Sequence, residues 1–209
     1  MKKYQILSAL HKEKIIGVIR INNPNAAEKS FEALLKGGIK SVELTFTVPF
    51  AHSILERVKR AFNNSLYIGA GTILDSESAR IAILSGADYL LTPSLNTEVI
   101  KTGNRYGIPV ISGIASATEA VHAIEMGCDV VKIFPANQFN YDVISSLKGP
   151  LPNLEVIPTG GIDIGNLVDW LKAGAFAVGV GGELTYGAAN GDFKLVTETA
   201  KKFCEVALI

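Results

Sequence analysis

One lysine lies inside an otherwise apolar run of the sequence, Val130-Val131-Lys132-Ile133-Phe134-Pro135. The run is typical of a buried strand, and lysine is seldom fully buried unless it is paired or has a chemical role. An amine removed from water shifts toward its neutral, nucleophilic form, whose usual use is a Schiff base with a carbonyl substrate. A lysine that reaches solvent, or that pairs with a buried carboxylate for structure alone, would give the same pattern.

Two further charged residues could complete such a site. Glu43 lies in the apolar run Val42-Glu43-Leu44-Thr45 and is either the acid/base that moves protons or a structural partner of the lysine. Both roles are compatible, because a neighbouring amine and carboxylate shift each other's protonation. Arg20 ends the first predicted strand and can hold a carboxylate through paired hydrogen bonds, or form a salt bridge at the rim.

Two glycine pairs follow the last two predicted strands. They are Gly160-Gly161, within Thr159-Gly160-Gly161-Ile162-Asp163, and Gly181-Gly182. Glycines at these positions let backbone N–H groups approach an anion, as in the phosphate sites of (β/α)8 barrels. Glu183 follows the second pair, and its carboxylate would repel a phosphate unless the side chain turns away.

The elements that must position these residues alternate along the chain. Apolar runs predict strands at residues 15–21, 41–45, 66–70, 89–92, 109–112, 130–135, 155–158 and 177–180. Helical spacing predicts a short leading helix at 4–11, then helices at 25–36, 50–62, 76–85, 96–106, 116–126, 141–148, 164–173 and 193–207. Ser76 and Asp192 are candidate caps of their helices.

Four helices are predicted to end in the same way. The joints are Lys36-Gly37-Gly38-Ile39, Ser85-Gly86-Ala87-Asp88, Met126-Gly127-Cys128-Asp129 and Ala173-Gly174-Ala175-Phe176. A glycine there lets the helix end in left-handed geometry before the next strand. Together, the eight strand–helix units predict a single-domain (β/α)8 TIM barrel over residues 1–209, with an open doubly wound sheet as the alternative. In a barrel the active site lies at the C-terminal ends of the strands.

Composition excludes several classes of protein. Hydrophobic residues make up 48% and charged residues 19% of the sequence, which favours a buried core, and the formal net charge is zero. We therefore expect no nucleic-acid or anionic-membrane partner, and no apolar run is long enough for a transmembrane helix. Two cysteines form no disulfide framework, and no signal peptide is recognisable, so we expect a cytoplasmic protein.

Other chemistries lack their motifs. The three histidines, at positions 11, 52 and 122, fall on or beside predicted helices without the spacing of metal ligands. The sequence contains no phosphate-binding P-loop, no dinucleotide fingerprint and no Gly-x-Ser-x-Gly nucleophile motif. We therefore expect neither a metal nor an organic cofactor.

Several segments together resemble the class I aldolases of 2-keto-3-deoxy-6-phosphogluconate (KDPG) and 4-hydroxy-2-oxoglutarate (KHG). They are Val42-Glu43-Leu44-Thr45, Gly69-Ala70-Gly71-Thr72, Thr92-Pro93, Val131-Lys132-Ile133-Phe134-Pro135-Ala136 and Pro158-Thr159-Gly160-Gly161-Ile162. The resemblance runs from about Ile15 to the last helix. It implies a homotrimeric (β/α)8 barrel without cofactor that cleaves KDPG to pyruvate and glyceraldehyde 3-phosphate, and KHG to pyruvate and glyoxylate.

The resemblance also implies roles for individual residues. Lys132 would be the Schiff-base lysine and Glu43 the general acid/base. The pyruvate end would be lined by Thr72, Pro93 and Phe134, and the phosphate end by the two glycine loops with Thr159, Gly160, Gly161, Gly181 and Gly182.

Two positions depart from the family pattern. Many members have a carboxylate-binding arginine where this chain has Thr47, so Arg20 is the candidate replacement, and many have a phosphate-binding serine where this chain has Glu183. The alternatives are an aldolase for an unphosphorylated or isomeric 2-keto-3-deoxy acid, a sugar-phosphate isomerase or epimerase with a purely electrostatic Lys132, and a non-catalytic binding protein.

Overall fold

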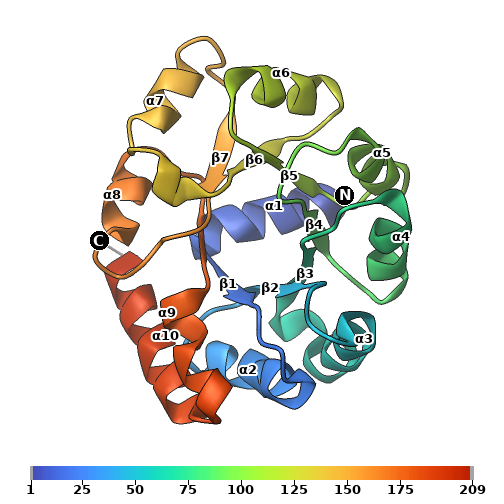
Figure 1. The fold of residues 1–209 in the computed structure, drawn as a ribbon, viewed down its shortest axis with the longest axis vertical. Helices are drawn as coiled ribbons and strands as arrows, with labels where there is room; N and C mark the ends of the chain where they lie inside the picture. The colour runs from blue at the N-terminus through green and yellow to red at the C-terminus, as the bar shows by residue number, and fades with distance from the viewer. Residues whose placement is uncertain (1, 208–209) are drawn as a thin grey trace.

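Strands and helices alternate along the chain in the computed structural model, which describes residues 2–207 (Figure 1). The strands are β1 (Ile15–Ile19), β2 (Ser41–Thr45), β3 (Tyr67–Gly71), β4 (Tyr89–Leu91), β5 (Val110–Ile114), β6 (Val130–Ile133), β7 (Glu155–Pro158) and β8 (Val178–Val180). The α-helices are α1 (Lys2–Glu13), α2 (Pro24–Lys36), α3 (Ala51–Phe62), α4 (Ser76–Leu84), α5 (Thr97–Arg105), α6 (Ala117–Glu125), α7 (Val143–Lys148), α8 (Leu167–Lys172), α9 (Gly182–Thr185) and α10 (Phe193–Ala207). Short 3₁₀ turns are η1 (Asn63–Ser65), η2 (Ala136–Gln138) and η3 (Tyr186–Asn190).

The eight strands form one parallel sheet that closes on itself. Their order is β7-β6-β5-β4-β3-β2-β1-β8, and a parallel bridge between Thr159 and Gly179 joins the β7 side to β8. The (β/α)8 barrel is therefore confirmed, and the open doubly wound alternative is wrong. None of the helices between residues 2 and 207 is both long and apolar enough to cross a membrane.

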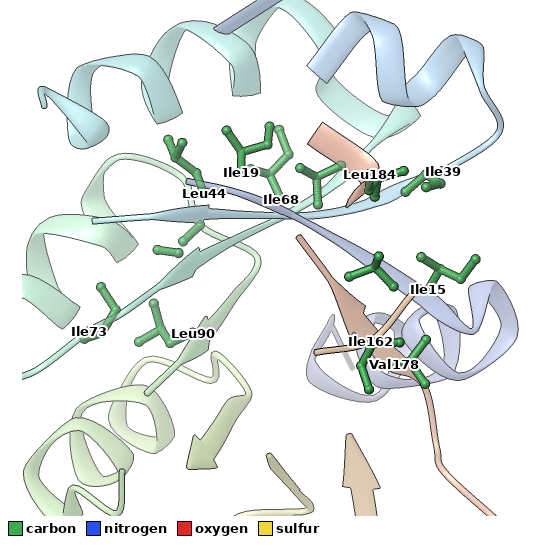
Figure 2. Close-up of a cluster of buried hydrophobic side chains, with 14 of the residues drawn as sticks. Ile15, Ile19, Ile39, Leu44, Ile68, Ile73, Leu90, Ile162, Val178 and Leu184 are labelled. Carbon is green, nitrogen blue, oxygen red and sulfur yellow. The ribbon is translucent and has the colours of Figure 1, made fainter. Parts of the chain in front are cut away.

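The apolar core has two parts, separated by the sheet. Figure 2 shows the outer part, where Ile19, Leu44 and Ile68 point from neighbouring strands toward the surrounding helices. The inner part fills the N-terminal half of the barrel and includes the buried side chains of Ile6, Leu7 and Leu10 from α1. The predicted leading helix therefore packs against the barrel interior at the end opposite the candidate active site.

The repeated glycine joints have the predicted geometry. The residues concerned are Gly38, Gly86, Gly127 and Gly174, whose φ angles lie between 93 and 98°. Residues with a Cβ adopt this left-handed conformation only under strain, so glycine is the residue that lets each helix turn into the next strand.

The structure corrects three local predictions. β1 ends at Ile19, so Arg20 follows the strand instead of ending it. The helix predicted at 76–85 is capped by Asp75, whose side chain accepts a hydrogen bond from the Ser78 N–H at 2.6 Å, and not by Ser76. Helix α9 and the turns η1, η2 and η3 were missed, because elements of three to five residues are too short to show a hydrophobic period.

Candidate active site

Lys132 and Glu43 face each other inside the barrel. Their strands, β6 and β2, lie on opposite sides of the barrel, and Lys132 Nζ is 3.7 Å from Glu43 Oε2. The side chains are only 3% and 1% exposed. The separation exceeds a hydrogen-bond length, and within residues 2–207 neither oxygen of Glu43 has a hydrogen-bond partner. The barrel thus holds a buried ion pair with unused acceptor capacity beside a primary amine.

Glycines on β3, β5 and β8 allow close packing around the site, and one of them makes room for Glu43. A Cβ on Gly71, at the end of β3, would overlap the Glu43 carboxylate. A Cβ on Gly113 of β5 would overlap the main chain of Pro93, and one on Gly179 of β8 would overlap the Thr159 side chain. Gly71, the second glycine of the Gly69-Ala70-Gly71-Thr72 segment, has no left-handed φ angle, so its backbone conformation does not require glycine. The close packing against Glu43 is what requires it.

The loop after β4 packs Pro93 against Gly113 of β5, the strand next to that of Lys132. The Thr92 hydroxyl donates a hydrogen bond to the Ser94 carbonyl at 2.7 Å and accepts one from the Gly113 N–H at 3.0 Å. Gly113 is paired with Lys132 in the β5–β6 register, so this hydroxyl fixes the loop against the strand next to Lys132. The importance of the Thr92 side chain could not be read from the sequence.

Thr72, which follows β3 directly, has a left-handed backbone. Its φ angle is 57°, which costs a β-branched residue of the order of 1 kcal/mol or more. Conformations of this kind persist where the surrounding structure enforces them, often at binding sites. The structure thus places Thr72 at the C-terminal end of the strand whose last residue, Gly71, contacts Glu43.

A cavity of about 460 Å³ opens at the C-terminal ends of the strands. It is lined by most of the predicted substrate-binding residues, namely Arg20, Phe134, Thr159, Gly160, Gly161, Gly181 and Gly182, together with Val18, Ile162, Asp163, Glu183 and Thr185. Lys132, Glu43, Thr72 and Pro93 do not line it. Phe134 connects the two regions, because its ring centre lies 5.0 Å from Lys132 Nζ while its side chain also borders the cavity.

The floor beneath the ion pair is aromatic. Tyr89 of β4 is fully buried, and its ring covers Gly69, which is paired in register with both Tyr89 and Glu43. Burial raises the pKa of the Tyr89 hydroxyl well above its ordinary value, and the negative charge of Glu43 raises it further. Tyr89 therefore stays neutral and adds no second negative charge below Glu43. The sequence analysis did not identify this residue as part of the site.

The described residues contain no cluster of three or more His, Cys, Asp and Glu side chains that could hold a metal ion. The histidines at positions 11, 52 and 122 lie on α1, α3 and α6, which surround or close the barrel. The charged groups that line the cavity are Arg20, Asp163 and Glu183. The arrangement therefore offers a nucleophilic amine, a carboxylate beside it and a cavity for an elongated substrate.

Comparison with known proteins gives the same chemistry. Residues 6–199 match the family described as KDPG and KHG aldolase. A 2-dehydro-3-deoxy-phosphogluconate aldolase of Treponema pallidum is 33% identical over 205 residues, which cover 96% of this chain and 97% of that protein. A 2-dehydro-3-deoxy-6-phosphogalactonate aldolase of Escherichia coli is 33% identical over 171 residues, covering 81% and 83%.

A solved structure of a similar protein contains a covalent intermediate. The KDPG aldolase of Legionella pneumophila, with pyruvate captured as a covalent carbinolamine, superposes with a TM-score of 0.88 at 29% identity and covers 94% of this chain and 97% of that one. With the family match over residues 6–199, these relatives settle the assignment. The chain belongs to the KDPG and KHG aldolase family and is a class I aldolase, a carbon–carbon lyase.

Proposed function

We propose that this aldolase cleaves KDPG to pyruvate and glyceraldehyde 3-phosphate, and KHG to pyruvate and glyoxylate, through an imine on Lys132. The observation that carries the proposal is the buried amine 3.7 Å from a buried carboxylate, at the active end of the barrel. The names of the curated relatives support a phosphorylated 2-keto-3-deoxy acid as one substrate. The family description supports KHG as another.

The reaction begins with covalent bond formation. Once Glu43 has taken a proton from it, the Lys132 amine adds to the C2 carbonyl and gives a carbinolamine, and loss of water then gives an iminium ion. The C4 hydroxyl gives its proton to the Glu43 carboxylate, the C3–C4 bond breaks, and the electron pair of that bond moves into the iminium to form an enamine as the aldehyde leaves. Protonation of the enamine at C3 and hydrolysis of the resulting iminium release pyruvate and restore the amine.

Glu43 is the proton carrier in this proposal. Its carboxylate lies close enough to Lys132 to receive and return protons, directly or through one water, during carbinolamine dehydration and enamine protonation. Neither of its oxygens has a hydrogen-bond partner in the part of the chain that the structure describes, so both can accept hydrogen bonds from the reacting groups. Phe134 and Tyr89 place aromatic rings around the site. Apolar surroundings limit hydrolysis of the iminium before the C3–C4 bond breaks, and they strengthen electrostatic interactions in the site.

The substrate assignment is tested with a small panel. Cleavage rates are measured for KDPG, its C4 epimer, unphosphorylated 2-keto-3-deoxygluconate and KHG, with pyruvate release as the common readout. We expect measurable kcat/KM on both KDPG and KHG. Pyruvate release from neither compound would overturn the proposed substrates and leave the family assignment standing.

Arg20 is proposed to bind the substrate carboxylate in place of the arginine that Thr47 replaces. The Thr47 hydroxyl lies 2.9 Å from the Thr45 hydroxyl, which donates to the Ile19 carbonyl at 3.2 Å. Thr47, which stands where many family members have the arginine, is therefore connected through Thr45 to Ile19, the residue directly before Arg20. The Arg20 side chain lines the cavity. A guanidinium there can reach a carboxylate that Thr47 cannot neutralise.

We expect Arg20→Ala to raise KM for KDPG and KHG about tenfold to a hundredfold, the usual effect of losing a hydrogen bond to a charged group. The inhibition constant of pyruvate should rise in parallel, because both ligands share the carboxylate. Arg20→Lys keeps the charge but not the paired hydrogen bonds, so its KM should lie between those of the wild type and Arg20→Ala. Unchanged pyruvate inhibition in Arg20→Ala would assign the carboxylate to another group.

The third part of the proposal is a homotrimer. Five large apolar side chains are partly exposed along α4, the end of α5 and α6, namely Ile81, Leu84, Tyr106, Val121 and Ile124. These elements are joined by Arg80 over the Tyr106 ring and by the Asn104 side chain, which donates to the Met126 carbonyl. An apolar surface of this kind is typical of an interface between subunits.

Sedimentation velocity tests the trimer. We expect the wild-type chain to sediment as three copies and Leu84→Glu, which puts a charge on the apolar surface, to sediment mainly as one. Leu195→Glu is the matched control, since Leu195 is also partly exposed but lies on α10, across the barrel from α4 (Figure 1). A monomeric wild type, or equal dissociation in both variants, would count against this surface.

We also propose that the enzyme works in the cytoplasm. Cys128 and Cys204 are both free thiols, and burial raises the pKa of Cys128 to about 12. A chain with free, unreactive cysteines and no disulfide among its described residues is suited to a reducing compartment.

A further inference from the structure

One carboxylate ties together the two glycine loops of the cavity. Glu183 follows Gly182 after β8, and its Oε2 accepts a hydrogen bond of 3.1 Å from the Ile164 N–H in the loop after β7. Both Gly160-Gly161 and Gly181-Gly182 line the same cavity. The side chain that stands where a phosphate-binding serine was expected is therefore engaged with the neighbouring loop.

The first part of the loop after β7 is held by the segment after β6, because the Asn137 N–H donates a hydrogen bond of 3.0 Å to the Gly160 carbonyl. The second part is held mainly by its own side chains. Asn166 accepts a hydrogen bond from the Asp163 N–H at 3.0 Å and donates one to the Gly161 carbonyl at 2.8 Å. The Asp163 carboxylate accepts hydrogen bonds from the N–H groups of Gly165 and Asn166. Within residues 163–166, only the Ile164 N–H is satisfied from outside the loop, and Glu183 is the residue that satisfies it.

The first glycine pair is held from both sides, since the Gly160 carbonyl accepts from the Asn137 N–H and the Gly161 carbonyl accepts from the Asn166 side chain. Gly160 and Gly161 have φ angles of 97° and 75°, so their N–H directions are set by a left-handed conformation that flexible loops readily leave. Asn166 fixes the Gly161 carbonyl, and Glu183 fixes the following segment against the second pair. Two loops that are connected in this way can present their amides to a single anion without first paying an ordering entropy.

We propose that Glu183 is a positioning residue that holds the two glycine loops at the spacing needed to bind the phosphate of the substrate; the proposal rests on KDPG being a substrate. The opposing effect is repulsion between this carboxylate and the phosphate. Glu183 is exposed, so water and salt screen its charge, and the hydrogen bond turns the carboxylate toward Ile164. Positioning should therefore outweigh repulsion.

Two variants separate the effects, because they change the charge and the hydrogen bond differently. Glu183→Gln removes the charge but keeps an oxygen that can accept from Ile164, whereas Glu183→Ala removes both. We expect KM for KDPG to change less than about twofold in Glu183→Gln and to rise about threefold to tenfold in Glu183→Ala. KM for KHG, which lacks the phosphate, and kcat for both substrates should stay the same. Inorganic phosphate should also inhibit Glu183→Ala more weakly than wild type.

The outcomes that overturn the proposal are distinct. If both variants lower KM for KDPG, the carboxylate acts mainly by repulsion. If Glu183→Ala impairs KDPG and KHG equally, the residue supports the fold in general. Glu198→Ala on α10 is the control for loss of one surface carboxylate. Borohydride trapping of pyruvate on the wild type is run alongside, so a failure of imine chemistry is recognised separately from a failure of loop positioning.

Discussion

Replacing Lys132 by alanine should abolish aldol cleavage, since no other amine is close enough to Glu43 to take its place among the ion pairs of residues 2–207. Removing one partner of a buried pair leaves the other unpaired, which typically costs about 3 kcal/mol or more of stability. Lys132→Arg separates this loss from the chemistry, because a guanidinium keeps the charge beside Glu43 but cannot form an imine. Both variants should be inactive, and Lys132→Arg should retain the higher melting temperature.

The measurement is reductive trapping. Wild-type enzyme incubated with pyruvate and borohydride should gain the mass of one reduced pyruvate unit, on the peptide that contains Lys132. Neither Lys132 variant should be labelled, while Lys101→Ala, which changes an exposed lysine on α5, should be labelled like wild type. A label on a different lysine, or none on the wild type, would show that the imine is not formed at this residue.

The fold could be predicted from the sequence because the patterns that indicate it are local and repeated. Buried parallel strands appear as short apolar runs, and a left-handed helix end requires glycine, so Gly38, Gly86, Gly127 and Gly174 marked the units correctly. Boundaries were less well determined. Whether β1 stops at Ile19 or at Ile21 depends on pairing with β2 and β8, which the residues of β1 do not encode alone.

The ion pair could also be predicted from the sequence, because lysine and glutamate in apolar strands are unusual enough to be recognised. The residues that shape its surroundings could not be. Tyr89 reads as an ordinary strand residue, and only the register Glu43–Gly69–Tyr89 across β2, β3 and β4 places its ring below the carboxylate. Thr92 likewise reads as the end of a strand until its hydroxyl is seen to bond to β5.

Glu183 shows how a correct residue can be given an incomplete interpretation. Its position after Gly181-Gly182 identified it as part of the distal loop, and repulsion of phosphate followed from its charge. The direction of its side chain depends on the Ile164 N–H, which belongs to a different loop and is 19 residues away in sequence. Long-range hydrogen bonds between loops carry no sequence period, so they have to be seen in three dimensions.

The second large effect is expected for Glu43→Gln, which should lower kcat for KDPG cleavage by about a hundredfold to ten-thousandfold, the usual contribution of one positioned proton carrier. Glutamine has almost the same shape, so the close packing against Gly71 is preserved, whereas a neutral amide cannot take up and return a proton. The residual activity should come from water acting as the proton carrier in the same cavity.

The chemical step that fails distinguishes this role from a structural one. Glu43→Gln should still form some pyruvate adduct with borohydride, because Lys132 remains in place, but exchange of the pyruvate methyl protons with deuterated water should slow by about the same factor as kcat. Glu43→Asp, which keeps the acid but withdraws it by one methylene from an amine 3.7 Å away, should recover part of both rates. Activity of Glu43→Gln within threefold of wild type would reduce Glu43 to a structural partner of Lys132.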